Sequence, residues 1–205
     1  MNTLWQSPAV GRAAVVLAHG AGAGMNHRNM QAIADAFELR GIATLRFEFP
    51  FMEAGRKRVD SQAVAVSRIA EAYAAAEALT TLPLWIGGHS FGGRMASHAV
   101  LDKELAPRGL IFCSFPLHAP GKPGIERARH LSSIACPMLF LSGTRDALAQ
   151  PGELEQVVGT LPSAKLHWLD TADHGYRVLK RQRSGSEDVF EEMARVAIAF
   201  IDRHS

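Results

Sequence analysis

Residues 82–100 read LPLWIGGHSFGGRMASHAV, and this stretch decides the fold class. The apolar run over residues 82–86 indicates a buried strand, and apolar residues then recur at helical spacing from Phe91 to Ala99. Ser90 therefore stands at a corner where a strand turns directly into a helix. Such a corner is typical of α/β proteins, in which strands and helices alternate along the chain.

The glycines of this corner follow the pattern G-x-S-x-G from Gly88 to Gly92. A turn tight enough to push the Ser90 hydroxyl into solvent leaves no room for side chains two residues on either side. The pattern therefore predicts a serine nucleophile on a strained corner. The alternative is an ordinary glycine-rich turn between a strand and a helix, so the prediction needs partner residues elsewhere in the chain.

Apolar runs alternate with helical patterns along the chain and begin near residues 13, 43, 82, 109, 137 and 165. Most of the runs lack a two-residue alternation, which suits strands covered on both faces. The final helix is expected to begin near Ser186. We therefore predict an α/β fold, a doubly wound, mostly parallel sheet of about six strands with helices on both faces. The length favours one domain over residues 1–205.

Two further residues follow strand ends at the same predicted rim, because parallel strands release their chains at one edge of the sheet. Asp146 lies in the loop after the fifth run, and His174 lies in the loop after the sixth. With Ser90 they follow the chain order serine, aspartate, histidine that accompanies a G-x-S-x-G corner. We expect Ser90 as nucleophile, His174 as base and Asp146 as the acid that orients it. Asp170 is expected to brace its turn, and Asp173 would have to fold back on its own neighbour.

The other histidines are less suited to the role of base. His98 lies eight residues along the expected helix from the serine, a rise of about 12 Å. His89 fills the free position of the corner and His19 ends the first run, so both are expected to be packed, hydrogen-bonded residues. The sequence leaves open the roles of His118 and His130.

The loop after the first run reads HGAGAG over residues 19–24 and has two interpretations. A dinucleotide fingerprint needs glycine or alanine at the sixth position from the first glycine, where Met25 stands, and the lysine of a phosphate-binding loop is absent. The alternative is an oxyanion hole, in which a backbone N–H of this loop joins the N–H of Phe91. Ala21 is the expected donor, with Gly22 the next choice, and no cofactor is expected.

Composition and charge exclude other classes of function. A formal net charge of +2 over 205 residues gives no general case for nucleic-acid or membrane binding. Cys113 and Cys136 have no metal-ligand neighbours in the sequence, so we expect free thiols, no metal site and a cytoplasmic location. The expected partner is a small acyl substrate, and the expected state is a monomer or small homo-oligomer.

The motifs LAHGAGAGM, FEFPF, GGHSFGGRMAS, FPLHAPGKP, RARHL and SGTRDALA together resemble the compact α/β hydrolases related to dienelactone hydrolase. The sequence is most similar to a small bacterial group akin to eukaryotic testis-expressed protein 30 and NSL-complex subunit 3, from about residue 13 to 200. This resemblance implies that the first and third runs are adjacent strands, with HGAGAG beside Ser90. The antiparallel strands that usually precede the first run are expected to be largely missing.

These residues predict hydrolysis of a small carboxylic ester or thioester through an acyl-enzyme intermediate. Only about twenty residues separate Pro116 from Pro137, too few for the helical lid of a lipase, so an open site for short acyl groups is expected. Two alternatives remain. One is a non-catalytic binding or scaffold protein on the same fold, since the resembled group includes a scaffold component. The other is an acyltransferase that uses the same three residues.

Basic residues gather in two loops that are expected at the rim. One loop reads GRKRVD and contains residues 56–58, and the other follows His174 and contains Arg177, Lys180, Arg181 and Arg183. A positive collar formed by both loops would concentrate anionic substrates in a salt-dependent way. The alternative is that nearby acidic residues neutralise these charges.

Overall fold

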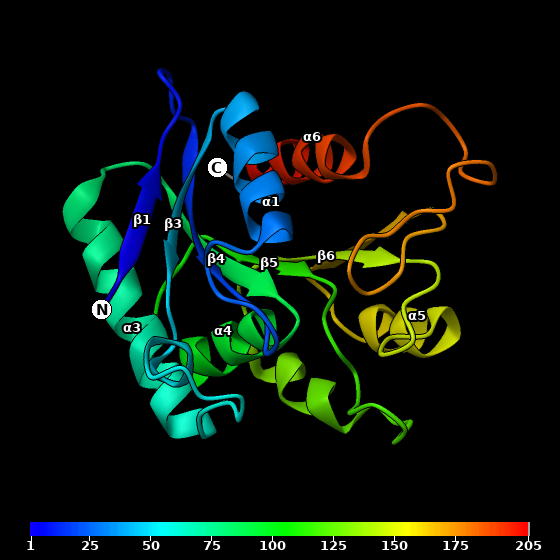
Figure 1. The fold of residues 1–205 in the computed structure, drawn as a ribbon, viewed down its shortest axis with the longest axis horizontal. Coiled ribbons are helices and arrows are strands. Elements are labelled where there is room, and N and C mark those ends of the chain that lie inside the picture. Colours follow the sequence, from blue (N-terminus) through cyan, green and yellow to red (C-terminus); the bar gives the residue numbers. More distant parts are fainter. Residues whose placement is uncertain (205) are drawn as a thin grey trace.

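The computed structural model describes residues 1–204, so Ser205, the last residue of the predicted domain, lies outside the described residues. Seven strands form one sheet in the order β1-β3-β2-β4-β5-β6-β7 (Figure 1). Every neighbouring pair is parallel except β1 with β3. The predicted, mostly parallel α/β sheet is confirmed, with one strand more than the six apolar runs. The strands are β1 (Thr3–Gln6), β2 (Ala13–Ala18), β3 (Ile42–Phe47), β4 (Leu84–His89), β5 (Leu110–Cys113), β6 (Met138–Gly143) and β7 (Ala164–Leu169).

The additional strand, β1, lies at the edge of the sheet and runs antiparallel to β3. One strand thus precedes the first apolar run, where we expected such strands to be largely missing. Four residues are too few for hydrophobic periodicity to reveal a strand. Its position is fixed by pairing instead, because the side-chain oxygen of Gln6 accepts a hydrogen bond at 3.0 Å from the buried guanidinium of Arg46 on β3.

Helices cover both faces of the sheet (Figure 1). On one face, α1 (Arg28–Leu39) packs beside α6 (Val189–Asp202). The buried strands serve both layers, since Val15 and Leu17 of β2 join the apolar cluster under α1 and α6, while Val16 joins the other. None of the helices within residues 1–204 is long and apolar enough to cross a membrane. The remaining helices are α2 (Pro50–Glu53), α3 (Gln62–Leu79), α4 (Phe91–Asp102), α5 (Pro151–Gly159) and the 3₁₀ helix η1 (Glu126–Ser133).

The final helix starts three residues later than the sequence pattern predicted. It begins at Val189 rather than Ser186. The cause is the N-cap, because the carboxylate of Asp188 accepts a hydrogen bond from the backbone N–H of Phe190 at 2.9 Å. Asp188 therefore caps the helix, and Glu187 belongs to the preceding loop.

The strand order determines which loops meet at the carboxyl edge. β2 lies between β3 and β4, which confirms the implied adjacency of the first and third apolar runs. Ala18 at the end of β2 stands opposite Gly88 of β4. The loop after β2 and the serine corner after β4 therefore leave the sheet side by side, at a point where ligands of such sheets commonly bind. The connection from β5 to β6, residues 114–137, contains η1 and no α-helix.

Candidate active site

Ser90 occupies a strained backbone position between β4 and α4. Its φ of 51° and ψ of −114° are unfavourable for a residue with a side chain. The corner is held from below, because the Ser90 N–H donates to the carbonyl oxygen of Cys113 on β5 at 2.9 Å. The predicted strand-to-helix corner is therefore present, and the strained residue lies at the carboxyl edge of the sheet.

The glycines of the corner are required by the neighbouring strand. A Cβ atom on Gly88, whose φ is 155°, would lie 2.2 Å from the carbonyl oxygen of Ala18 at the end of β2. A Cβ atom on Gly92 would lie 2.5 Å from the carbonyl oxygens of both Ala18 and His19. These distances are shorter than a Cβ atom adopts in real structures. The two glycines therefore allow the serine corner and α4 to pack directly against the end of β2.

His174 lies between the serine and an aspartate, as the strand-end argument predicted. Its Nε2 is 2.8 Å from the Oγ of Ser90. Its Nδ1 is 2.8 and 2.9 Å from the two carboxylate oxygens of Asp146. The Asp146 side chain is fully buried, whereas the His174 side chain is 25% exposed. Three residues from three separate loops therefore form one hydrogen-bonded chain from the core to the surface.

The Asp146 carboxylate is fixed by its own loop. Its Oδ1 accepts a second hydrogen bond from the backbone N–H of Leu148 at 2.8 Å. The Asp146 N–H donates to the carbonyl oxygen of Gly143 at the end of β6, at 3.1 Å. A carboxylate held in this way presents both oxygens to the histidine without freedom to turn away.

The two competing aspartates bind backbone groups in their own loop. The Oδ1 of Asp173 accepts from the N–H groups of Gly175 and Arg177 at 2.9 and 3.0 Å. The Oδ2 of Asp170 accepts from the N–H of Ser184 at 2.7 Å. Both carboxylates therefore shape the turn around His174, and neither is hydrogen-bonded to its ring in the structure.

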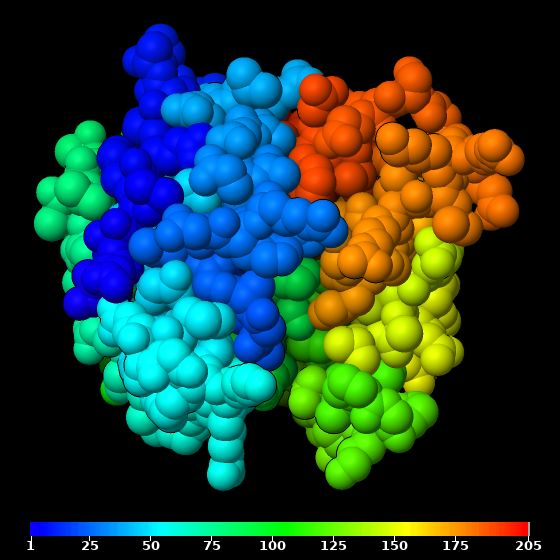
Figure 2. Space-filling view, viewed as in Figure 1, coloured from blue at the N-terminus to red at the C-terminus, as the bar shows by residue number. Residues whose placement is uncertain are grey.

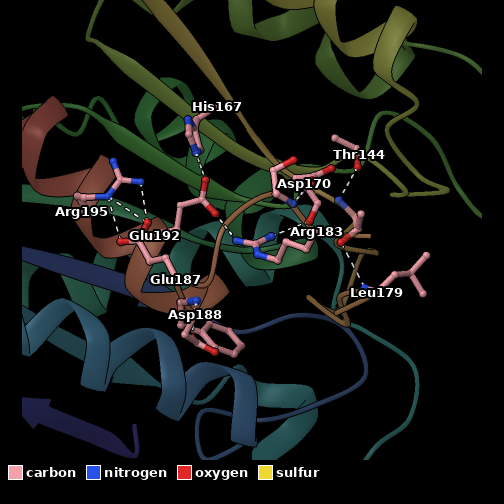
Figure 3. A network of polar contacts seen from close by, with 12 residues as sticks. Thr144, His167, Asp170, Leu179, Arg183, Glu187, Asp188, Glu192 and Arg195 are labelled. Carbon is pink, nitrogen blue, oxygen red and sulfur yellow. Dashed lines mark hydrogen bonds and ion pairs between the residues drawn. The ribbon is translucent and has the colours of Figure 1, made fainter. Parts of the chain in front are cut away.

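The chain after His174 is tied down by a polar network (Figure 3). The Arg183 side chain donates to the carbonyl oxygen of Asp170 and contacts the carboxylate of Glu192 on α6. The hydroxyl of Thr144 accepts from the N–H of Thr171 at 2.8 Å, which joins this loop to the loop that carries Asp146. The network thus links the histidine loop to the neighbouring loop and to α6.

His89 supports the turn that carries His174. Its Nε2–H donates to the carbonyl oxygen of His174 at 2.9 Å. Burial lowers the pKa of His89 to about 4, so the ring is neutral at neutral pH. On its other side the ring lies against Gly20, where a Cβ atom would be 2.8 Å from its Nδ1. His89 is therefore a packed residue that holds two loops of the site together, as its position in the corner suggested.

His19 is also a buried structural residue. Its Nδ1–H donates to the carbonyl oxygen of Gly20 at 2.8 Å, and its Nε2 accepts from the N–H of Phe49 at 3.1 Å. Burial lowers the pKa of this ring. The adjacent carboxylate of Glu48 accepts from the N–H of Met25 at 3.1 Å and so holds the far end of the HGAGAG loop. Sequence reasoning assigned no role to Glu48, which belongs to the FEFPF motif.

The contacts of His98, His118 and His130 are made with groups other than Ser90, His174 and Asp146. The rings of His98 and His130 stack with centroids 3.7 Å apart. The hydroxyl of Ser97 donates to the carbonyl oxygen of Arg94 at 2.7 Å, so the His130 Nε2–H must donate to that hydroxyl at 2.8 Å. Burial lowers the pKa of His130 to about 4. The Nδ1–H of His118 donates to the neighbouring carbonyl oxygen of residue 119 at 2.9 Å. These contacts give His98, His118 and His130 packing roles.

A cavity of about 370 Å³ opens beside Ser90 and is lined by the first loop. Ala21 and Gly22 line it with Ser90 and His174, and both loop residues are exposed. Phe91 is the first residue of α4, so its N–H has no acceptor within the helix. The expected oxyanion donors, the N–H groups of Ala21 and Phe91, therefore come from segments on either side of the serine.

No group of three histidine, cysteine, aspartate or glutamate side chains within residues 1–204 is arranged to hold a metal ion. Cys113 and Cys136 are free thiols. Burial raises the pKa of the Cys113 thiol to about 12, which makes it a poor nucleophile.

Comparisons with known proteins identify the family of the chain and solved structures that share its fold. The family described as "Alpha/beta hydrolase domain" matches residues 11–202. Est1E from Butyrivibrio proteoclasticus, solved with ferulic acid bound, superposes with a TM-score of 0.76 at 15% identity over 98% of this chain and 95% of its own. Dienelactone hydrolase from Anabaena variabilis superposes with a TM-score of 0.73 at 16% identity, over 98% of this chain and 90% of its own. A Xanthomonas campestris α/β serine hydrolase without a lid superposes with a TM-score of 0.70 at 19% identity, over 98% of this chain and 88% of its own.

Proposed function

Since this chain belongs to the alpha/beta hydrolase domain family, we propose that it is a serine hydrolase that cleaves a small carboxylic ester or thioester. Its catalytic residues are Ser90, His174 and Asp146. The observation that carries the proposal is their hydrogen-bond chain, with 2.8 Å from serine to histidine and 2.8 Å from histidine to aspartate. In such a chain a histidine can take a proton from a serine while a buried carboxylate stabilises the resulting imidazolium.

The reaction begins with proton transfer from the Ser90 Oγ to the His174 Nε2 as the oxygen attacks the substrate carbonyl carbon. A tetrahedral intermediate forms, and the backbone N–H groups of Ala21 and Phe91 donate to its negatively charged oxygen. His174 then gives the proton to the departing oxygen or sulfur as its bond to the carbonyl carbon breaks, and the alcohol or thiol leaves. An acyl group remains on the serine.

Water completes the cycle. His174 removes a proton from a water molecule that attacks the acyl carbonyl, the bond between that carbon and the Ser90 Oγ breaks, and the serine recovers its proton. No α-helix stands in the β5–β6 connection, residues 114–137, so the site has no helical lid from this segment. The open cavity of about 370 Å³ favours short acyl groups.

We propose a closer kinship with the bacterial group akin to testis-expressed protein 30 and NSL-complex subunit 3. The support is the set of motifs in the sequence, of which GGHSFGGRMAS forms the serine corner and FEFPF supplies Glu48 beside the first loop.

The direct test is intact-mass spectrometry after reaction with a fluorophosphonate probe. Wild type should gain one adduct, and Ser90→Ala should gain none. Ser132→Ala is a matched control, since this serine is exposed on η1 and donates only to a nearby carbonyl oxygen. Absence of an adduct on wild type would favour a scaffold or binding protein. Transfer of the acyl group from a labelled ester to an added alcohol, in preference to water, would identify an acyltransferase.

A further inference from the structure

A second hollow, of about 460 Å³, adjoins the serine cavity and is rich in arginine. The two hollows share His174, Gly175, His27 and Asn29 in their linings. Figure 2 shows the surface here, where the blue segment near residue 28 meets the orange segment near residue 175. This contact is fixed by a hydrogen bond of 2.8 Å from the Asn29 side chain to the Gly175 carbonyl oxygen.

The arginines come from three separate loops or helix ends. Arg28 is the first residue of α1, Arg145 precedes Asp146, and Arg177 follows the turn that carries His174. All three are exposed. Arg145 donates to the carbonyl oxygen of Thr171 at 3.0 Å, which holds its guanidinium at the rim.

Carboxylates do not neutralise this group. Among residues 1–204, no carboxylate oxygen lies within ion-pair distance of the guanidinium groups of Arg28, Arg145 or Arg177. Asp173 also lines the hollow, but its Oδ1 accepts two backbone N–H groups of its own turn. The hollow therefore presents three guanidinium groups against one carboxylate, and guanidinium groups bind carboxylate and phosphate through paired hydrogen bonds.

The loops of the collar predicted from the sequence behave differently. Arg56 forms an ion pair with the buried Asp60 at 2.7 Å. Arg183 is nearly buried and pairs with Glu192. Of the collar residues, Arg177 is the one that lines this hollow. The guanidinium groups that line the hollow beside His174 are thus those of Arg28, Arg145 and Arg177.

This location fits one half of the substrate. In the proposed reaction the proton on His174 Nε2 passes to the departing oxygen or sulfur, so the leaving group lies against His174. The acyl oxygen instead faces the N–H groups of Ala21 and Phe91. A leaving group that extends beyond His174 therefore enters the arginine hollow.

We infer that Arg28, Arg145 and Arg177 bind an anionic group, a phosphate or carboxylate, on the alcohol or thiol half of the substrate. This inference rests on the proposed hydrolase function. It names the chemical class of the leaving group and gives the arginines a role in substrate selection. The two anions share the same recognition chemistry, and the substrates of the test separate them.

The test measures kcat/KM for four esters by chromatography of the released acid. Acetylglycerol phosphate and the acetyl ester of 3-hydroxypropanoate carry the charge on the leaving group, succinylglycerol carries it on the acyl half, and acetylglycerol is neutral. Wild type should prefer the first two over acetylglycerol by about 10-fold to 100-fold, since hydrogen bonds to charged groups are the strong ones. A preference for one of these two assigns the anion as phosphate or carboxylate.

Two double variants with the same loss of charge locate the effect. Arg28→Gln/Arg177→Gln should lose most of the preference for the anionic leaving group. Lys57→Gln/Arg58→Gln, on an exposed loop outside the hollow, should keep the wild-type ratio. Equal loss in both variants, no preference in wild type, or a preference for succinylglycerol alone would each overturn the inference while leaving the hydrolase intact.

A binding measurement keeps the inference testable if none of the esters is cleaved. Isothermal titration calorimetry measures binding of glycerol 3-phosphate to the hollow directly, with glycerol as the uncharged control. Binding to wild type that is lost in Arg28→Gln/Arg177→Gln supports the site without hydrolysis. Absence of binding, or equal binding to that variant and to wild type, would reject it.

Discussion

His89 donates a hydrogen bond of 2.9 Å from its Nε2 to the backbone carbonyl oxygen of His174. A neutral histidine of the serine corner thus holds the turn that presents the proposed base. The two rings are also neighbours, with centroids 5.3 Å apart. Positive charge on His89 would therefore arise beside the site as well as inside the protein.

Acid should destabilise the fold through its buried histidines. The pKa of His89 and that of His130 are both about 4 in the folded protein, against 6.5 for an ordinary histidine. Between these values the unfolded chain binds more protons than the folded one, so the free energy of unfolding falls as the pH drops from about 7 to 4. Carboxylates with lowered pKa lose their contribution only below about 4.5.

Chemical denaturation between pH 7 and 4.5 measures this effect. His89→Gln should flatten the pH dependence by on the order of 1 kcal/mol across the window. His204→Gln removes an exposed histidine near the carboxyl end and should leave the slope as in wild type. An identical slope in His89→Gln and wild type would show that His89 does not resist protonation.

The second prediction concerns the acid of the triad. Asp146→Asn should preserve the fold but lower ester turnover by about 10⁴-fold, because an amide no longer selects the histidine tautomer that accepts the serine proton. Asp170→Asn and Asp173→Asn remove carboxylates that bind backbone N–H groups, so their losses should be much smaller. The turnover of one short-chain ester by the three variants measures this difference. If Asp170→Asn or Asp173→Asn lost its activity while Asp146→Asn stayed active, Asp146 would not be the acid partner of His174.

Replacement of a corner glycine should cost stability. A methyl group at position 92 would meet the carbonyl oxygens of Ala18 and His19 at 2.5 Å, so Gly92→Ala should lose about 1–3 kcal/mol. Gly152→Ala places the same methyl group on a helix with no atom within 4 Å, and should change stability by less than about 1 kcal/mol. Thermal melting of both variants provides the comparison. Equal melting temperatures would mean that the end of β2 moves to accommodate the added methyl group at little cost in stability.

Glu48 should act on turnover by positioning the first loop. Its carboxylate accepts the N–H of Met25, so Glu48→Ala frees the end of the segment that supplies the Ala21 donor. We expect kcat to fall about 10-fold, less than the loss for removal of a whole oxyanion donor, with little change in KM. Glu48→Gln keeps a carbonyl oxygen as acceptor and should recover most of the activity. Failure of that recovery at unchanged thermal stability would exclude this positioning role.

Much of the site could be predicted because parallel strands place their loops at one edge. That rule brought Ser90, Asp146 and His174 together from positions 56 and 28 residues apart in the chain, and the structure places them within hydrogen-bonding distance. The short-range pattern of glycines also located the serine corner, because side chains at Gly88 and Gly92 would clash with the end of β2.

The features that sequence reasoning missed depend on tertiary contacts. The strand β1 has four residues and is defined by pairing with β3, which no periodicity within the strand reveals. Glu48 gained its role only when β3 placed it against the loop after β2. The arginine hollow joins positions 28, 145 and 177, and neither spacing nor charge runs connect them. Of the collar residues predicted from charge runs, Arg56 and Arg183 pair with carboxylates elsewhere, and Arg177 lines this hollow.

The left-handed backbone of Ser90 implies a conflict between activity and folding. A φ of 51° with a ψ of −114° costs a residue with a side chain on the order of 1–3 kcal/mol, a penalty that glycine escapes. Under the proposed function, the same chain with glycine at position 90 would therefore be inactive yet harder to unfold. On that premise, the hydroxyl at position 90 is kept at a cost in folding stability.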